Sequence, residues 1–235
     1  SAFTYYTGFK VNSGEYKVMG LAPYGKPKFK DLIIRELMDL KDDGSFKLNM
    51  KYFDYATGLT MTNKKFSDLF GHPVRDPKKD LLNNFHMDIA SSIQAVTEEI
   101  VIRLTRNIAK EHKIKNLCLA GGVALNCVAN GKILQEKIFN NIWIQPAAGD
   151  AGGSLGAALA YWHHELEKPR DNFKDRMSGS YLGPKYNNDA IEMELKSFNA
   201  NYKKLDRSEI ISITAKELAN EKIVGWFQGR MEFGP

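Results

Sequence analysis

The sequence lacks any hydrophobic run long enough to cross a bilayer. No stretch approaches the ~20 consecutive apolar residues of a membrane-spanning helix, and residues 1–5 lack the basic start and apolar core of a signal peptide. Only two cysteines occur in 235 residues, Cys118 and Cys127. So few cysteines argue against a disulfide framework and favour packing roles in a reducing compartment, with Cys118 in a buried strand. We therefore expect a cytoplasmic protein without a membrane partner.

A concentrated positive surface is also missing. The net charge is +5, but the lysines are scattered in short groups at 26–30, 63–65 and 77–80. No basic stripe is interleaved with aromatic residues, as a nucleic-acid interface would require. We interpret these lysines as solvated surface groups and do not expect nucleic acid as a partner.

Two common nucleotide-binding fingerprints are absent, G-x-G-x-x-G and the P-loop pattern G-x-x-x-x-G-K-[ST]. None of the five histidines has a second histidine four residues away. The His163–His164 pair lies near the end of an expected helix, where histidines usually complement the helix dipole. A metal-ligand cluster of this pair near Glu167 is the less favoured alternative.

What is present is a repeated pattern in residues 114–161. Apolar runs at 116–120 and 141–145 predict two strands, and the patterns at 123–137 and 154–166 predict a helix after each. A glycine-rich turn separates each strand from its helix. Strand, glycine turn and helix, repeated in under fifty residues, predict the parallel crossover unit of an α/β sheet.

Both glycine turns fall between the carboxyl end of a strand and the amino end of a helix. Free backbone N–H groups and the helix dipole favour an anion such as phosphate there. The residues concerned are Gly121, Gly122, Gly149, Gly152 and Gly153, with Asp150 placed to hold a metal that bridges phosphates. Tight turns without a ligand are the alternative interpretation, and these patterns alone leave both open.

The long segment 80–113 predicts one helix with a single apolar stripe, roughly 50 Å long. Its polar residues Asp88, Ser92 and Gln94 are interpreted as forming hydrogen bonds locally within a packed helix. Towards the amino end, the patterns predict a strand at 2–9, a short helix at 13–20, an amphipathic helix at 28–40, a hairpin arm at 45–53 and a helix at 64–70.

Beyond the glycine turns, the polar segment 168–172 predicts a linker. Four elements are expected after it: a helix at 189–198, an extended segment at 200–205, a helix at 208–220 and a strand at 222–227.

Specific residues carry a family resemblance. The runs LAGGVALNCVANGK and QPAAGDAGGSLGAAL within 114–161, GEYKVMGLAPYG at 14–25, HMDIASSIQ at 86–94 and VGWFQGRMEFGP at 224–235 occur in family order. The chain resembles the carbamoyltransferases that modify antibiotics and nodulation factors, which belong to the actin/sugar-kinase superfamily.

This resemblance implies an α/β fold in two domains. Residues 1–170 would form an actin/sugar-kinase-like (ribonuclease H-like) carbamoyl-transfer domain, and residues 178–235 the beginning of a YrdC-like α/β adenylating domain. By this resemblance the chain is a piece of a longer enzyme, and we expect the isolated piece to be inactive.

The implied activity is ATP-dependent O-carbamoyl transfer. Carbamoyl phosphate and ATP would form carbamoyl-adenylate, and the carbamoyl group would pass to a hydroxyl of a small molecule or sugar near a divalent metal, usually iron. Two alternatives remain: a threonylcarbamoyl transferase acting on tRNA, and a non-catalytic nucleotide-binding module of the same fold.

The resemblance also assigns candidate site residues. Asp150 would be the catalytic carboxylate and a metal ligand, while Arg230 and Glu232 belong to the adenylating domain. The nucleotide would be held by Glu15, Lys17, Gly121, Gly122, Val123, Asn126, Gly149, Gly152 and Gly153. For Glu15 the alternative is a carboxylate that complements the start of a helix, for Lys17 a solvated surface group, and for Asn126 an ordinary helix asparagine one turn into 123–137.

Overall fold

The computed structural model describes residues 1–170 and 176–234. The chain divides into two compact units, Ser1–Gln145 and Pro146–Pro235. Both units are mainly helical, and the described strands form two small two-stranded sheets in the first unit. The described part of the chain is therefore of mixed α/β class, as the sequence predicts.

The first unit contains most of the regular structure. In chain order its helices, helical turns and strands are α1 (Ala2–Tyr6), α2 (Glu15–Leu21), η1 (Ala22–Tyr24), α3 (Lys30–Leu32), η2 (Ile33–Leu37), β1 (Met38–Leu40), β2 (Phe46–Leu48), η3 (Met50–Tyr52), α4 (Lys64–Phe70), α5 (Asn84–His112), β3 (Asn116–Leu119), η4 (Gly122–Leu125), α6 (Cys127–Gln135) and β4 (Asn141–Ile144).

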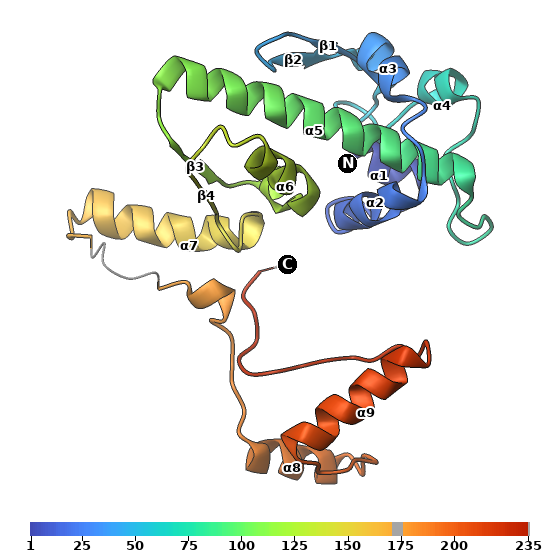
Figure 1. Ribbon diagram of the computed structural model, residues 1–235. Helices are drawn as coiled ribbons and strands as arrows, with labels where there is room; N and C mark the ends of the chain where they lie inside the picture. Colours follow the sequence, from blue (N-terminus) through green and yellow to red (C-terminus); the bar gives the residue numbers. More distant parts are fainter. Residues whose placement is uncertain (171–175, 235) are drawn as a thin grey trace. The chain divides into compact units, whose positions relative to one another are not determined.

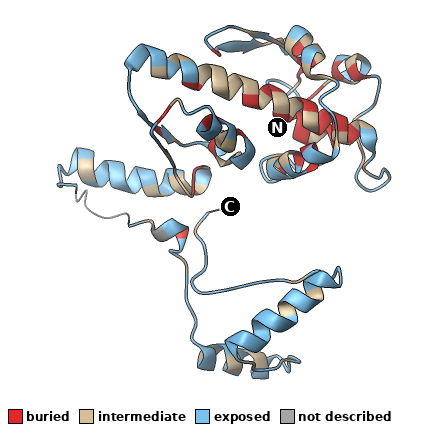
Figure 2. Cartoon of the chain, in the orientation of Figure 1, coloured by how far each residue is buried: buried red, intermediate tan, exposed pale blue. Residues whose placement is uncertain are grey.

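Helix α5 is the centre of this unit (Figure 1). Its 29 residues confirm the helix predicted at 80–113, with Asn83 as the N-cap and Lys113 ending it in a left-handed conformation. The main hydrophobic core lies against its N-terminal half, where the buried positions in Figure 2 concentrate. That core consists of Phe3, Tyr6, Ile33, Leu37, Tyr52, Phe53, Phe66, Phe70, Ile89 and Val96.

The predicted strand at 2–9 is wrong, because residues 2–6 form helix α1. Phe3 and Tyr6, three residues apart on a helix, both meet the ring of Phe66, with centroid distances of 5.3 and 4.9 Å. The Tyr6 hydroxyl also donates to the carbonyl of His72 at 2.7 Å. Tertiary packing of these aromatic rings has overridden the local preference for strand.

The helix predicted at 28–40 is shorter than expected. Helical structure ends at Leu37, and β1 then pairs antiparallel with β2, Met38 opposite Leu48. Gly44, with φ of 88°, closes the turn between these strands. The predicted hairpin arm is therefore confirmed at Phe46–Leu48, and its partner strand comes from the end of the predicted helix.

The predicted parallel crossover is confirmed for β3 and β4. The two strands pair in parallel, with Asn116 opposite Asn141 and Leu119 opposite Ile144, and α6 connects them. Leu117 of β3 and Ile133 of α6 are buried together with Phe139. Cys118 departs from the prediction, because it is exposed, as is Cys127.

The second unit contains α7 (Asp150–Ala160), η5 (Tyr161–Glu165), η6 (Ser178–Ser180), α8 (Asn188–Ser197) and α9 (Arg207–Ala219). Helices α8 and α9 confirm the helices predicted at 189–198 and 208–220. The strand predicted at 222–227 is wrong, and 200–205 is not part of a strand. None of the helix residues of α7, α8 and α9 is buried, so local signals such as the Asp206–Glu209 capping box define their ends.

Part of the predicted linker at 168–172 lies outside the described residues. The division into domains 1–170 and 178–235 stays a prediction. Among the described helices, none combines the length and the apolar character needed to span a membrane.

Two glycines in the segment 14–25 lead to opposite predictions. A Cβ added to Gly25 would lie 2.1 Å from the backbone carbonyl atoms of Met87, whereas a Cβ on Gly20, inside α2, would meet no atom within 4 Å. We expect Gly25→Ala to destabilise the protein by about 1–3 kcal/mol through steric overlap. Gly20→Ala should stabilise it by about 0.5–1 kcal/mol through helix propensity. Urea unfolding measures both, and equal effects of the two substitutions would contradict the packing of Gly25 on α5.

His86 completes the cap of α5 in its neutral form. Its Nδ1 accepts from the backbone N–H of Asn83 at 3.3 Å, while Asn83 Oδ1 accepts from the backbone N–H of His86 at 3.4 Å. Burial lowers the pKa of His86 from its usual 6.5, and the charges of Arg75 and His72 lower it further, against an opposing effect of Asp80.

The depressed pKa of His86 predicts a pH-dependent stability. As the pH falls below about 6.5, the unfolded chain binds a proton at His86 before the folded protein does. The stabilisation is therefore present above that pH and is lost as the pH falls through the folded pKa. We expect His86→Gln, which keeps a cap acceptor, to reduce the loss of unfolding free energy between about pH 7.5 and about pH 5.5. Parallel urea unfolding of both proteins measures it, and identical losses would contradict the assignment.

Candidate functional site

The turn after β3, residues 121–125, is called the glycine turn below. Gly121 has φ of 97°, a backbone conformation that favours glycine. Gly122 begins the short 3-10 helix η4, and no atom lies within 4 Å of a Cβ built on either glycine. Among the described residues, no neighbouring atom would clash with a Cβ at Gly122, so packing does not require glycine at this position. The turn therefore leaves open space in which a ligand can approach the main chain.

Asn126 lies at a break between two helical segments. The helix predicted at 123–137 is interrupted there, because Asn126 has non-helical dihedrals and forms the N-cap of α6. Its Oδ1 accepts from the backbone N–H of Ala129 at 3.0 Å. The prediction of an asparagine one turn into a helix is therefore wrong, although Asn is among the preferred N-cap residues and could have signalled this boundary.

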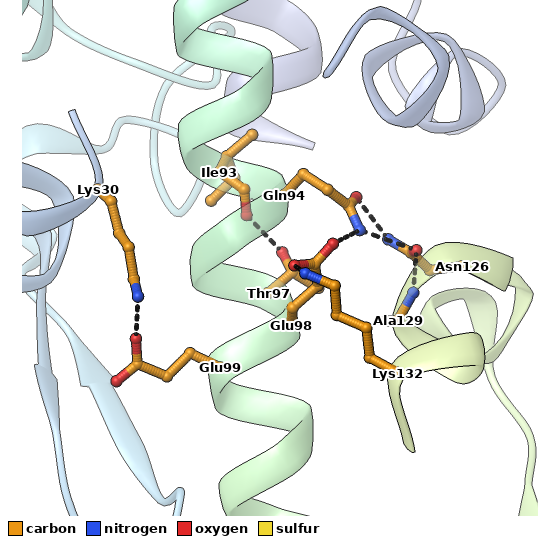
Figure 3. A network of polar contacts seen from close by, with 9 residues as sticks. All are labelled: Lys30, Ile93, Gln94, Thr97, Glu98, Glu99, Asn126, Ala129 and Lys132. Carbon is orange, nitrogen blue, oxygen red and sulfur yellow. Dashed lines mark hydrogen bonds and ion pairs between the residues drawn. The ribbon is translucent and has the colours of Figure 1, made fainter. Parts of the chain in front are cut away.

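A partly buried polar network fixes Asn126 to α5 (Figure 3). Gln94 Nε2 donates to Asn126 Oδ1 at 3.1 Å, and Asn126 Nδ2 donates to Gln94 Oε1 at 2.9 Å. Gln94 Nε2 also donates to Glu98 Oε1 at 3.0 Å, and Glu98 pairs with Lys132 of α6. The interpretation of Gln94 as locally bonded within α5 is therefore incomplete. No sequence motif identified Glu98 or Lys132 as part of this network.

The segment before α3 is held to the same helix. Asp88 Oδ1 accepts from the backbone N–H of Lys26 at 2.7 Å, and its other oxygen pairs with Lys28 Nζ at 2.5 Å. Ser92 Oγ accepts from the backbone N–H of Phe29 at 2.9 Å and donates to the Asp88 carbonyl. Only this last bond is local, so Asp88 and Ser92 mainly make long-range contacts, contrary to the interpretation from sequence.

Glu15 is the first residue of α2 and is half-buried. Its carboxylate accepts from the backbone N–H groups of Asn12 at 3.1 Å and Gly14 at 3.2 Å, and from the Ser1 hydroxyl at 3.0 Å. Burial raises the pKa of Glu15, but these hydrogen bonds outweigh burial and leave the pKa below its usual value. The geometry matches the helix-start alternative, and a contact of Glu15 with nucleotide stays a prediction.

A sulfur contact brings α2 to the start of α6. Cys127 Sγ lies 4.0 Å from Met19 Sδ. Met19 is one helical turn from Glu15, so the predicted nucleotide residues of α2 and of the glycine turn belong to neighbouring elements. Lys17 is exposed, with Nζ 5.9 Å from the centroid of the Tyr16 ring, and Val123 is also exposed.

The second glycine loop lies in the other unit. Gly149 is the N-cap of α7 and Asp150 its first residue, with an exposed side chain. The Gly152 backbone N–H donates to the Gly149 carbonyl at 3.1 Å, and a Cβ on Gly153 would meet open space. A single cleft shared by Asp150 and the glycine turn stays a prediction.

No cluster of three or more His, Cys, Asp or Glu side chains suited to a metal ion is found within residues 1–170 and 176–234. Asp150 supplies one carboxylate, and His163 Nδ1 lies 2.8 Å from the carbonyl of Lys168. The described side chains therefore do not form a metal site by themselves.

Near the carboxyl end, Arg230 and Glu232 are both exposed. Arg230 donates from Nη1 to the carbonyl of Gly183 at 2.7 Å, beside backbone hydrogen bonds that join Met231 to Gly183 and Pro184. Arg230 therefore helps to hold two segments of the second unit together, and its predicted phosphate contact stays a prediction.

Comparison with known proteins gives this site a context. Residues 1–159 match the family model described as Carbamoyltransferase N-terminus. The chain is 61% identical, over its whole length, to "Uncharacterized protein sll1178" of Synechocystis sp.. Over 94% of its length it is 36% identical to nodulation protein NolO of Bradyrhizobium diazoefficiens and 37% identical to nodulation protein NolNO of Sinorhizobium fredii. It spans 38% of the first two relatives and 30% of the third.

Proposed function

Since the chain belongs to the carbamoyltransferase N-terminus family, we propose that it serves an ATP-dependent O-carbamoyltransferase. In this proposal water first releases inorganic phosphate from carbamoyl phosphate and leaves carbamate. A carbamate oxygen then attacks the α-phosphate of ATP, and pyrophosphate leaves to give carbamoyl-adenylate. A hydroxyl of a small molecule or sugar then attacks the carbamoyl carbon, and AMP leaves with its bonding electron pair. The role of the described chain is to hold the adenylate.

We further propose an actin/sugar-kinase-like fold for the domain predicted at 1–170 and the beginning of a YrdC-like fold for residues 178–235. The parallel pair β3–β4 with α6 between its strands supports the first assignment. The second rests on the resemblance of residues 224–235 to the family signature. The described strands form two small two-stranded sheets. Both assignments therefore rest mainly on family membership.

The observation that carries the proposed nucleotide site is the open glycine turn. Gly121 and Gly122 leave space at the main chain where β3 meets η4 and α6. Backbone N–H groups at such a strand-to-helix turn attract phosphate oxygens. Helix α2, next to the start of α6, would supply Glu15 towards ribose hydroxyls and Lys17 towards phosphate.

A divalent metal remains part of the proposal, with Asp150 as one ligand. A Lewis acid would polarise the carbamoyl oxygen and so favour attack by the acceptor hydroxyl. One exposed carboxylate does not make a metal site, and no group of three or more His, Cys, Asp or Glu side chains suited to a metal ion is found among the described residues. For Asp150 we propose that its carboxylate would hold such a metal against the phosphate groups, because a carboxylate without a bound cation repels phosphate.

Calorimetric titration of ADP tests the proposed nucleotide site. With a divalent metal present in the buffer, we expect the folded chain to bind ADP, and Asn126→Ala and Asp150→Ala each to weaken it about tenfold, close to 1.4 kcal/mol. Asn187 and Asp189 of α8 provide matched controls, because Asn187 is also an N-cap and Asp189 also lies in a first helical turn. Asn187→Ala and Asp189→Ala should leave ADP affinity unchanged. A folded chain that binds no ADP would refute the site.

The two exposed cysteines provide an independent test. Cys127 is the first residue of α6, beside the glycine turn, whereas Cys118 lies on β3 before it. We expect saturating ADP to slow alkylation of Cys127 by iodoacetamide at least about threefold, because bound ligand would cover the turn. Cys118 is the internal control, and peptide mass spectrometry measures both rates. Equal rates with and without ADP at Cys127 would place the nucleotide elsewhere.

A further inference from the structure

Gln94 is a buried polar residue that links α5 to Asn126, directly after the glycine turn, and it belongs to none of the predicted nucleotide contacts. We propose that Gln94 is a positioning residue for the nucleotide site, acting through Asn126 to fix the start of α6 and the glycine turn. This inference rests on the proposed function.

The amide groups of Gln94 and Asn126 form a closed pair. Each side chain donates one N–H to the other's oxygen, at 3.1 and 2.9 Å. Asn126 Oδ1 accepts a second bond from the backbone N–H of Ala129. The same amide therefore caps α6 and joins it to α5, so a shift of Gln94 moves the cap directly.

Glu98 and Lys132 determine which way the Gln94 amide faces. The second hydrogen on Gln94 Nε2 goes to Glu98 Oε1 at 3.0 Å, and Glu98 is paired with Lys132. A flipped amide would place Gln94 Oε1 against the Glu98 carboxylate, two acceptors without a hydrogen between them. Only the observed orientation presents an oxygen to Asn126 Nδ2, so the ion pair defines the geometry of the amide pair.

The glycine turn is also tied internally to this cap. Asn130 Nδ2 donates to the carbonyl of Ala124 at 2.7 Å, which connects α6 back to η4. Gln94 thus acts on residues 121–125 through Asn126 and the first turn of α6. On the same helix, Asp88 and Ser92 hold the segment that follows 14–25. Six residues of helix, about 9 Å, separate Asp88 from Gln94 and set the spacing of the two segments.

A double-mutant cycle on ADP affinity tests the route of action. Gln94→Met keeps the side-chain volume and removes the amide, while Asn126→Ser keeps an N-cap oxygen and removes the pair. We expect Gln94→Met to weaken ADP binding about fivefold to tenfold in the wild-type chain, and less than about twofold in the Asn126→Ser chain. Equal weakening in both backgrounds, or none in the wild type, would overturn the role of Gln94.

Thr97→Val is the matched control on the same helix. The Thr97 hydroxyl donates to the carbonyl of Ile93 within α5, at 2.8 Å, and no dashed line joins it to α6 in Figure 3. The substitution keeps volume and removes a hydrogen bond, so general weakening of α5 would appear here too. We expect ADP affinity to remain within about twofold of the wild type. A loss as large as that of Gln94→Met would overturn the specific assignment.

A measurement without nucleotide separates this inference from the proposed function. Gln94→Met should increase the alkylation rate of Cys127 relative to Cys118 at least about twofold, because the start of α6 is less constrained. An unchanged ratio would overturn positioning by Gln94 even where ADP binds. Absence of ADP binding by the folded wild-type chain would instead refute the nucleotide site itself, and this role of Gln94 with it.

Discussion

Burial of several faces of one helix, α5, holds the first unit together. Its apolar residues Ile89 and Val96 are fully buried in the main core, and Ala90 packs in a second cluster with Val18, Leu21 and Ala22 of α2 and η1. Its polar residues Ser92, Gln94 and Glu98 are buried as well. A helix buried on several sides needs partners for its polar groups, because an unpaired buried polar group is costly.

Those polar partners lie in or next to the segments that contain the proposed nucleotide residues. Asp88 and Ser92 bond to the backbone of residues 26 and 29, and Gln94 bonds to the cap of α6. Hydrogen bonds require defined distances and angles, whereas apolar contacts allow sliding. The buried polar groups of α5 therefore fix the register of both segments on one rigid element, with apolar packing supplying most of the stability.

The proposed carbamoyl transfer through an adenylate would require that adenylate to be held in a fixed position away from water. The described chain provides an open main-chain turn at Gly121 and Gly122, with a helix start next to it and α2 nearby. A rigid support behind an open turn combines access for the ligand with a defined geometry. The proposed role in holding an adenylate rests on family membership together with this arrangement.

Sequence by itself determined the elements whose signals are local and periodic. The long helix α5, the parallel pair β3–β4 and the capped helices α8 and α9 all follow from apolar spacing or capping residues. The glycine turn and its family motif could also be recognised in the sequence, because glycine directly after a strand usually marks a turn.

Where non-local contacts compete with local preference, only the tertiary structure decided which conformation forms. Residues 2–6 are helical because Phe3 and Tyr6 pack on Phe66. Met38–Leu40 were predicted as the end of a helix, but they form a strand that pairs with Phe46–Leu48. The Gln94–Asn126 pair joins residues that are 32 positions apart in the sequence, and the Glu98–Lys132 pair joins residues that are 34 positions apart. Periodicity within one segment carries no information about such partners, because they are chosen by how separate elements meet in space.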